Sequence, residues 1–335
     1  MFTTRFVIDQ TNLYKYLPIK MFMARIKHLM IYPVKSCAGI ELTEADLQKS
    51  GLSLGWLRDR ELAFVRRTSD DYRRLLTQRD KRDDKDRTQG LADLTNIKPR
   101  FIRGVLQLSW NGEDPINIFP FSFNRRAIMY AQHGDDRFDV VLNENSDVYE
   151  WASDHLGLQV YLVRTANDVI RSTTYRIAKQ NYEPNDNCIQ LQDGYPVHWI
   201  SEESIRELSD IVEEEIDWKS FRPNIVVEGM SPQYEHKIYS GEIVGIPFVN
   251  SKPCDRCPIT KVNQVTGEVD KKGKILKALS TYKNWFNKDN EKKVIFGENM
   301  LPLKSGQIDV FGGLIVTAER NPPLVYGSME DIKKK

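Results

Sequence analysis

The sequence predicts a β-rich fold of mixed α+β class with two domains, and three observations support this prediction. The chain has 335 residues, which is long enough for two domains that each bury a hydrophobic core. Short runs rich in Val, Leu, Ile and Phe alternate with Gly, Asn, Asp and Pro, a pattern typical of β-barrels and sandwiches. Helical periodicity is clear in only two segments, so few helices are expected.

The first predicted domain covers residues 26–165 and follows an N-terminal extension, residues 1–25. Its first strand is expected in IKHLMIYPVKS, which closes at Pro33, and further strands in ELTEADLQ, GWLRDRELAFVRR, FIRGVLQLSW and NIFPF. A helix is predicted over residues 147–158, because its apolar residues fall on one stripe. That stripe consists of Val148, Trp151, Ala152, His155 and Leu156, and core packing is the commoner role for a histidine placed there.

A charged segment, residues 69–93, interrupts the strands of the first domain. Its centre, RDKRDDKDR, is a run of nine consecutive charged residues of both signs. Such a run is usually a solvated loop, and this is the prediction here. The alternative is a docking surface for a charged protein partner.

The second predicted domain covers residues 170–325 and is followed by a tail, residues 326–335. It opens near Cys188 after a polar, irregular junction. The segment SEESIRELSDIVEE predicts a helix, with Ser201 and Ser204 as alternative N-caps and acids in the first turn. Strands are expected around Asn224–Val227, around Gly241–Val249 and along IFGENMLPLKSGQIDVFGGLIVTAE.

Composition and missing motifs exclude several classes of protein. Lys and Arg number 48 against 47 acids, so the net charge of +1 gives no attraction to nucleic acid. No apolar run approaches the roughly 18 residues that span a bilayer, and four cysteines suit a reducing compartment rather than a disulfide scaffold. Gly-x-Gly-x-x-Gly, Walker A and His-Glu-x-x-His motifs are absent, so the chain should neither bind its own nicotinamide nor hydrolyse ATP.

The first 27 residues hold five basic residues and a single acid, Asp9. This composition weakly resembles a mitochondrial presequence, although the segment is not rich in serine. An irregular extension before the first strand explains it equally well.

The pair Cys254 and Cys257 is the most informative feature, because two cysteines this close bind a soft metal, cycle as a dithiol or simply pack. A redox pair normally opens a helix, but here a β-rich stretch with a turn at Thr266-Gly267 follows. A four-cysteine zinc site needs a second close pair, and Cys37 and Cys188 are isolated. A single thiolate donated to a cofactor, or two ordinary buried cysteines, remain.

Three segments, far apart but in a fixed order, resemble one known pattern. The first is IYPVKSC, which starts at Ile31 and is followed by Leu57-Arg58-Asp59-Arg60. The second is FRPNIVV, which starts at Phe221. The third is CDRC, which starts at Cys254 and continues to Leu276, Leu279 and Tyr282. Together they resemble the MOSC family, named for the molybdenum-cofactor sulfurase C-terminal domain. Within it the chain is most similar to the mitochondrial amidoxime-reducing component and its relatives, over about residues 25–311.

The resemblance implies an N-terminal MOSC_N-like β-barrel domain packed on a C-terminal MOSC β-barrel domain, with the molybdenum cofactor, Mo-molybdopterin, between them. It makes Cys257 the molybdenum ligand and catalytic residue, and it gives Cys254 no ligand role. A soft thiolate suits molybdenum, and arginine forks suit a phosphate. The cofactor-binding residues are then Lys35, Ser36, Arg60, Asp193, Gly194, Tyr195, Arg222, Asn224, Asp255 and Arg256. Without the resemblance, salt bridges and solvent exposure would explain these residues as well.

The sequence departs from the family pattern at two places in this set. Close relatives carry a Thr-Ser pair after an aspartate, whereas this chain has Asp193-Gly194-Tyr195, which puts substrate preference in doubt. Asp255 stands where relatives often have a small residue, and its negative charge is expected to lower the reduction potential of the metal. 

The expected function is that of a molybdenum-dependent oxidoreductase, which reduces N–O bonds in N-hydroxylated compounds such as amidoximes and hydroxylamines. Because the chain has no flavin, haem or nicotinamide motif, electrons must come from outside. The resemblance implies cytochrome b5 and its NADH-dependent cytochrome b5 reductase as donors, and a location at the mitochondrial outer membrane or in the cytoplasm. The alternatives are a non-catalytic carrier of the cofactor, a sulfurase lacking its pyridoxal-phosphate domain, and an interaction protein with a degenerate site.

Overall fold

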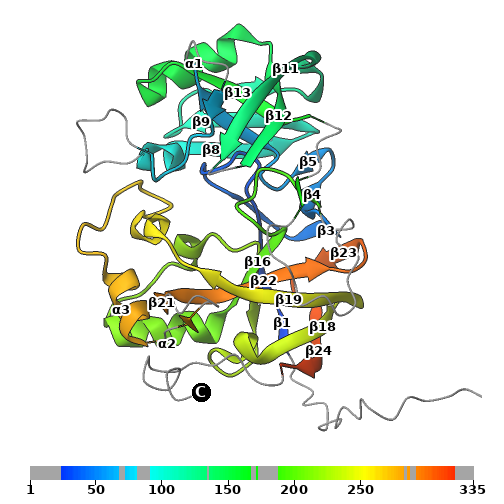
Figure 1. Ribbon diagram of the computed structural model, residues 1–335, viewed down its shortest axis with the longest axis vertical. Coiled ribbons are helices and arrows are strands. Elements are labelled where there is room, and N and C mark those ends of the chain that lie inside the picture. The colour runs from blue at the N-terminus through cyan, green and yellow to red at the C-terminus, as the bar shows by residue number, and fades with distance from the viewer. Residues whose placement is uncertain are drawn as a thin grey trace, which may run out of the picture.

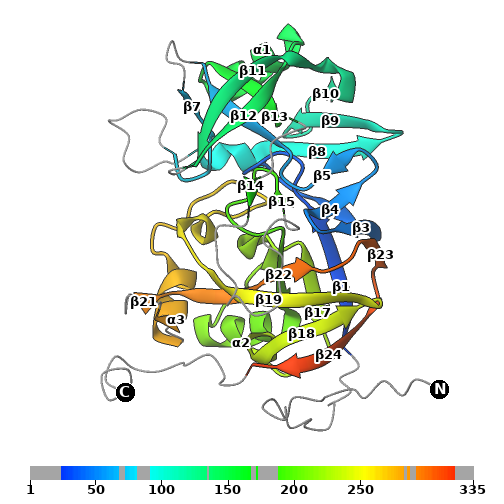
Figure 2. The same ribbon diagram turned by 45° about the vertical axis from the view of Figure 1, so that its right-hand side comes forward.

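The structure is a computed structural model that describes residues 24–67, 72–80, 91–133, 136–166, 171–172, 188–282, 285–286 and 292–320. Two β-rich bodies are stacked along the long axis of the molecule (Figures 1 and 2). The predicted fold class is therefore confirmed: both bodies are β-rich, the second closes as a barrel, and helices are few. No helix in these ranges is long and apolar enough to cross a membrane.

The second body is a closed ring of seven strands. In order around the ring they are β1 (Ala24–Ile31), β17 (Ile225–Glu228), β16 (Val197–Ser201), β22 (Ile295–Pro302), β19 (Ile246–Asp255), β18 (Ile238–Ile243) and β24 (Gly313–Glu319). The ring closes because β1 pairs with β17 on one edge and with β24 on the other, where β2 (Ile40–Leu42) follows. Trp199 and Phe248 are fully buried inside and meet edge to face at 6.3 Å.

Two helices, α2 (Glu202–Val212) and α3 (Lys274–Tyr282), cover one side of this ring (Figure 1). Their apolar residues, among them Leu208 and Leu279, share a core with Phe221 and Phe296. The α2 helix starts as predicted, because the Ser201 side chain accepts a hydrogen bond from the Ser204 amide and acts as the N-cap.

The first body consists of two sheets around a shared core. A five-stranded sheet has the order β6 (Leu62–Arg66), β13 (Val160–Thr165), β12 (Asp136–Asn143), β11 (Phe123–His133) and β7 (Tyr72–Arg74), and a three-stranded sheet the order β10 (Ile116–Ile118), β9 (Val105–Trp110) and β8 (Ile97–Ile102). Helix α1 (Ser146–Leu156) packs on them through Val148, Ala152 and Leu156. Asn145 caps α1, and Gly157 ends it with φ of 62°.

His155, predicted to pack in the core, lies at its edge instead. Its ring bonds the Trp151 carbonyl at 2.8 Å and the Glu113 carboxylate at 2.6 Å, between the rings of Trp110 and Trp151.

A small sheet joins the beginning and the end of the chain. It contains β23 (Gly306–Asp309), β3 (Glu44–Gln48), β4 (Gly51–Leu54) and β5 (Leu57–Arg58) in that order. The sequence assigned β1 to the first domain, but its pairing makes it a strand of the second barrel. The boundaries proposed at residues 165 and 170 stay predictions, since residues 167–170 and 173–187 lie outside the described part.

The remaining elements are short. They are β14 (Arg171–Ser172), β15 (Cys188–Ile189), β20 (Trp285–Phe286), β21 (Lys292–Lys293), and the 3-10 helices η1 (Ala92–Asn96), η2 (Pro120–Ser122), η3 (Trp218–Phe221), η4 (Tyr234–Lys237) and η5 (Pro258–Lys261).

One local prediction stays open and another needs correction. Within the charged segment 69–93, β7 pairs in parallel with β11, and Leu75 and Leu76 after it are buried, but the solvated loop predicted for the run RDKRDDKDR stays a prediction. Residues 81–90 of this segment lie outside the described part. The region Gly241–Val249 is a hairpin rather than one strand, since Val244 and Gly245 have φ of 51° and 73° and reverse the chain between β18 and β19.

Candidate active site

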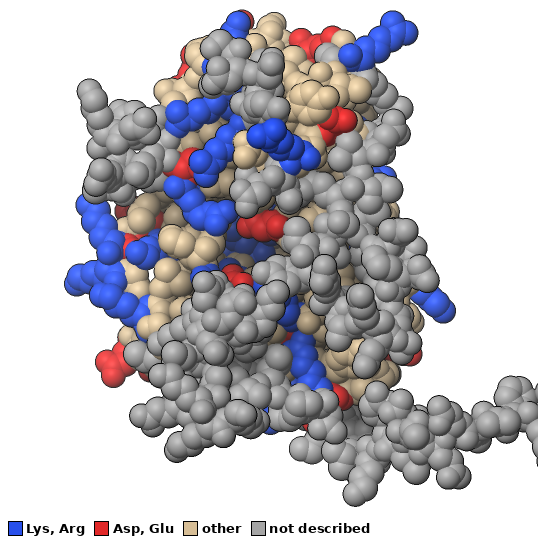
Figure 3. Space-filling model, in the orientation of Figure 1, with Lys and Arg blue, Asp and Glu red and all other residues tan. Residues whose placement is uncertain are grey.

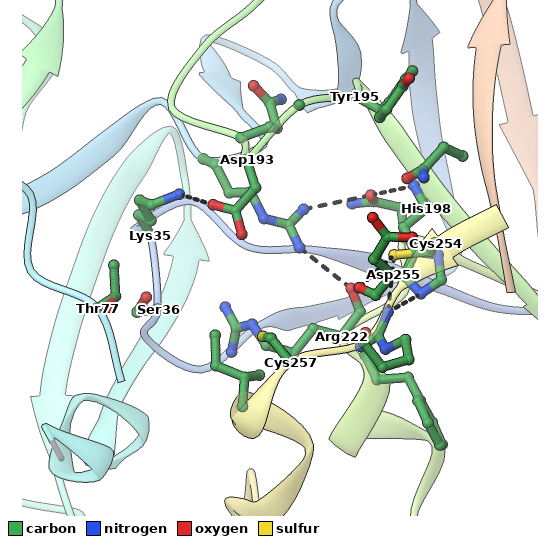
Figure 4. A pocket seen from close by; sticks show the side chains of 18 of the residues that line it. Lys35, Ser36, Thr77, Asp193, Tyr195, His198, Arg222, Cys254, Asp255 and Cys257 are labelled. Atoms are coloured by element: carbon green, nitrogen blue, oxygen red, sulfur yellow. Dashed lines mark hydrogen bonds and ion pairs between the residues drawn. The ribbon is translucent and has the colours of Figure 1, made fainter. Parts of the chain in front are cut away.

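A cleft of about 290 Å³ lies between the two bodies and is lined by residues of both. Every residue that the sequence predicted for the site lines it: Lys35, Ser36, Arg60, Asp193, Gly194, Tyr195, Arg222, Asn224, Asp255, Arg256 and Cys257. Figure 4 shows their side chains converging from opposite sides. Six lysine or arginine side chains and two aspartates line the cleft, so it favours an anionic ligand. In Figure 3 blue side chains lie above and to the left of the middle of the molecule, with grey atoms on its other sides.

Lys35 reaches the cleft from the turn after β1, and its ammonium is buried. Nζ donates to the Leu191 carbonyl at 2.7 Å and to Asp193 Oδ1 at 2.5 Å. His133, at the end of β11, contacts the same oxygen at 3.0 Å. Two cationic or protonatable groups of the first body therefore hold one carboxylate of the second, although 60% of the Asp193 side chain is exposed and solvent screens the pair.

Three predicted residues share an uncommon backbone conformation. Ser36, Arg60 and Arg222 have φ of 66°, 51° and 52°, in the left-handed region that residues other than glycine rarely adopt. Such conformations cost free energy and persist where the surroundings fix them, which is common at binding sites. All three line the same cleft, whereas the six other non-glycine residues with positive φ in the described part lie elsewhere.

A buried polar network fixes Arg60. Its Nη1 forms an ion pair with Asp59, which is completely buried, and its Nη2 donates to the Arg222 carbonyl at 3.2 Å. Asp59 Oδ1 also accepts from the Tyr32 amide at 2.8 Å and from Asn224 Nδ2 at 3.0 Å. Burial alone would lower the pKa of Arg60, but Asp59 and the other neighbouring groups raise it above its usual value, so the guanidinium remains charged.

The Asn224 amide is fully engaged within the protein. Nδ2 donates to Asp59 and to the Met30 carbonyl, and Oδ1 accepts from Arg60 Nη1 and from the His198 amide. Asn224 therefore braces the cleft wall, with no amide hydrogen left for a ligand.

The Tyr32 ring lies between two guanidinium groups, with the Arg60 and Arg222 carbons 4.6 and 4.2 Å from its centroid. Burial raises the pKa of Tyr32 above its usual value, so the phenol is neutral. Burial also lowers the pKa of Arg222 to about 10, so this guanidinium is still charged at neutral pH. Its Nη2 is buried and has no hydrogen-bond partner among the described residues.

The two cysteines face different surroundings. Cys254 lies on β19, where its sulfur accepts from Arg256 Nη1 at 3.0 Å and burial raises the pKa of the thiol. Cys257 precedes η5 and is half-buried on the cleft wall. Both thiols are free. No group of three or more His, Cys, Asp or Glu side chains suited to a metal occurs in the described ranges.

His198 lines the cleft as well, although the histidine spacing in the sequence gave no sign of it. Burial and the neighbouring Arg256 hold the pKa of His198 well below its usual value, so the ring is neutral. Its Nε2 accepts from Arg256 Nη1 at 2.9 Å, and its Nδ1 then donates to the Glu298 carbonyl at 3.3 Å. Arg256 Nη2 donates to the Phe221 carbonyl at 2.8 Å, so this guanidinium is held on two sides.

Four residues that contact the cleft lining without being part of it were not predicted either: Asp59, His133, Gln78 and Gln264. Only Asp59 had a signal, because it lies within the Leu57-Arg58-Asp59-Arg60 segment. 

Comparisons with known proteins agree with this architecture. The family model described as MOSC N-terminal beta barrel domain matches residues 23–159, and that described as MOSC domain matches residues 186–311. Mitochondrial amidoxime reducing component 2 of Rattus norvegicus is 26% identical over 275 residues, which are 77% of this chain and 72% of the relative. Mitochondrial amidoxime-reducing component 1 of Mus musculus is 25% identical over 82% of this chain and 74% of its own.

A third relative is longer than this chain. Molybdenum cofactor sulfurase of Arabidopsis thaliana is 26% identical over 81% of this chain but only 32% of its own length. Among solved structures, the YUAD protein of Bacillus subtilis covers 87% of this chain and 93% of its own at 11% identity and a TM-score of 0.35, from which we draw no conclusion.

Proposed function

We propose that this chain, which belongs to the MOSC-domain family, is a molybdenum-cofactor-dependent reductase that cleaves N–O bonds in N-hydroxylated compounds such as amidoximes and hydroxylamines. The observation that carries the proposal is the composition of the cleft: two free thiols, Cys254 and Cys257, share it with guanidinium groups, and Arg222 Nη2 and Arg256 Nε are buried without a hydrogen-bond partner among the described residues. The matched relatives are named amidoxime reducing components and molybdenum cofactor sulfurase.

The residues fit the cofactor in their chemistry. Cys257 would donate the soft thiolate that suits molybdenum. Arg222, with its unpartnered Nη2, together with Arg60, Lys35 and Ser36 would hold the pterin phosphate, because paired N–H donors match phosphate oxygens. Asn224 is assigned a bracing role rather than a pterin contact, since its amide is fully engaged.

Asp255 would lower the reduction potential of the metal less than its negative charge alone suggests. Its carboxylate pairs with Lys252 at 2.9 Å, and this cation offsets the negative charge near the metal. 

The reaction consumes two electrons and two protons, breaks the N–O bond and releases the reduced nitrogen compound and water. When bound, the cofactor would supply the electron pair at the substrate oxygen. Arg256, held by His198 and the Phe221 carbonyl, would keep a fixed positive charge beside the reacting oxygen. Electrons would come from an external donor, for which we propose cytochrome b5 and its NADH-dependent reductase in the mitochondrion.

A cofactor carrier is the second candidate function. The match to a third of the length of molybdenum cofactor sulfurase favours it, because that relative is named for cofactor chemistry rather than for N–O reduction. A carrier would hold molybdenum but would not reduce an amidoxime from a chemically reduced donor.

Molybdenum per chain is the first measurement, on protein from a host that makes the eukaryotic form of the cofactor. A ratio near one, followed by amidoxime reduction, would support the proposal. Cys257→Ala should lower turnover at least about 100-fold, because the metal loses its protein ligand. Cys254→Ser is the matched control and should retain both metal and turnover. Wild-type turnover in Cys257→Ala with metal bound would refute the assignment of Cys257.

A further inference from the structure

Gln78 and Gln264 meet behind two residues that line the cleft, Ser36 and Arg222, although they are 186 residues apart in the sequence. Gln78 follows β7 in the first body, and Gln264 follows η5 in the second. Both are buried, with 3% and 7% of their surface exposed. Each amide donates to the oxygen of the other at 3.1 Å, so the two side chains form a reciprocal pair between the bodies.

The surroundings fix the orientation of both amides. Arg222 can only donate, so the Gln264 oxygen must face Nη1, which lies 2.7 Å away. The Ser36 carbonyl can only accept, so the Gln78 nitrogen must face it, at 2.7 Å. Gln264 Nε2 completes the set by donating to the Val262 carbonyl at 3.1 Å. Both hydrogens of the Gln264 amide are donated in hydrogen bonds. Flipping either amide would place a donor against a donor or an acceptor against an acceptor.

The loop that carries Gln264 is itself braced. Asn263 Oδ1 accepts from the amides of Val265 and Thr266 at 2.9 and 3.1 Å, and Gly267 turns the chain with φ of 75°. Gln264 thus stands on a rigid turn rather than on a flexible connection.

We infer that Gln264, locked by Gln78, is a positioning residue for Arg222 and preserves its charge for an anionic ligand of the cleft. A neutral amide occupies Nη1 and leaves Nη2, the atom without a partner, as the donor available to a ligand on the cleft wall. A carboxylate at position 264 would hold Nη1 equally well but would neutralise the guanidinium. The pair also connects Arg222 to the strained Ser36, two residues that the proposed function assigns to one phosphate.

The test measures inorganic phosphate as the probe on chain free of cofactor. Phosphate is titrated at constant ionic strength, with chloride as the balancing salt, and affinity is taken from the rise in unfolding temperature. We expect Gln264→Glu to weaken phosphate binding about tenfold and Gln264→Leu about threefold, since loss of the charge matters more than loss of the acceptor. Gln78→Leu, which removes the lock but not the acceptor, should also cost about threefold.

Gln233→Leu is the matched control, because Gln233 is equally buried but bonds Glu207, outside the cleft. It should change the unfolding temperature without changing phosphate affinity. A purely structural role for Gln264 predicts instead that losses of affinity follow losses of unfolding temperature whatever the charge. Three results would overturn the inference. One is that losses of affinity follow losses of unfolding temperature. The others are equal phosphate affinity in wild type and Gln264→Glu, and a wild type that phosphate does not stabilise.

The inference rests on the proposed function only for the identity of the anion, the phosphate of the cofactor. Molybdenum content distinguishes a failure of the inference from a failure of the proposed function. If the wild-type chain lacks molybdenum but still binds phosphate through Arg222, only the proposed function is refuted. If molybdenum is present, Gln264→Glu should lose it on dialysis about tenfold faster than wild type.

Discussion

Replacement of Asp59 by alanine tests whether the buried network under the cleft is as strongly coupled as its geometry indicates. The carboxylate is completely buried and is the ion-pair partner of Arg60, whose side chain is only 15% exposed. Removing one partner of a buried pair leaves the other charge uncompensated, which costs about 3–5 kcal/mol. The Tyr32 amide and Asn224 Nδ2 lose their acceptor as well, at about 1–3 kcal/mol each if they remain unpaired. We therefore expect Asp59→Ala to lower the free energy of unfolding by at least about 3 kcal/mol.

Urea unfolding followed by both tryptophan fluorescence and circular dichroism measures this change, and coincident transitions justify a single free energy. Asp46→Ala, on the exposed face of β3, is the control and should stay within about 0.5 kcal/mol of wild type. In a double-mutant cycle with Arg60→Met, the loss should be strongly non-additive, because removing the cation also removes the need for Asp59. A cost below about 1 kcal/mol, or additive losses, would refute the reasoning.

Two further predictions concern the barrel wall around His198. Its folded pKa lies below its unfolded value, so only the unfolded chain gains a proton as pH falls below about 6.5, and stability should fall by up to about 1.4 kcal/mol per pH unit there. His198→Gln should flatten that slope in urea unfolding between pH 5 and 8, and parallel curves would contradict this. Gly297→Ala should cost about 3 kcal/mol or more in the same assay, since φ is 73° and the new Cβ would lie 2.6 Å from His198 Cε1 and 2.7 Å from the Trp199 carbonyl. Gly104→Ala, with φ of 81° and open space, should cost only about 1 kcal/mol, and equal costs would refute the steric argument.

The sequence predicted the two-barrel class and the set of residues that meet in the cleft, because both depend on patterns that are local or occur in a fixed order. The Ser201 cap, the α1 stripe and the Thr266-Gly267 turn are local signals, and the structure contains each of them. The roles of the matched residues stay predictions, since their common location does not identify a ligand.

The sequence could not indicate features that depend on distant partners. A glutamine has no pattern of its own, and Gln264 gains its role from Gln78 and Arg222 only in the folded chain. Likewise, a serine or arginine in the sequence does not predict a left-handed backbone. The many charges of the 69–93 segment drew attention away from Leu75 and Leu76, which are buried. The pairing of β1 with strands of the second barrel could not be predicted for the same reason, because its partners lie about 200 and 290 residues further along.

The place of β1 in the ring has a consequence for how the chain is made. This strand is the first of the described strands to leave the ribosome, but β24 follows only about 290 residues later, with Ala24 opposite Leu314. At 5–20 residues per second, β1 waits on the order of 15–60 s for the partner that closes the ring. Until then the end of β1 at Ala24 and Arg25 lacks the partner on that edge, and a fragment beginning after the first domain would lack β1 and could not close the ring. Expression of the second domain alone should therefore include residues 24–31, for example by joining them to its N-terminus.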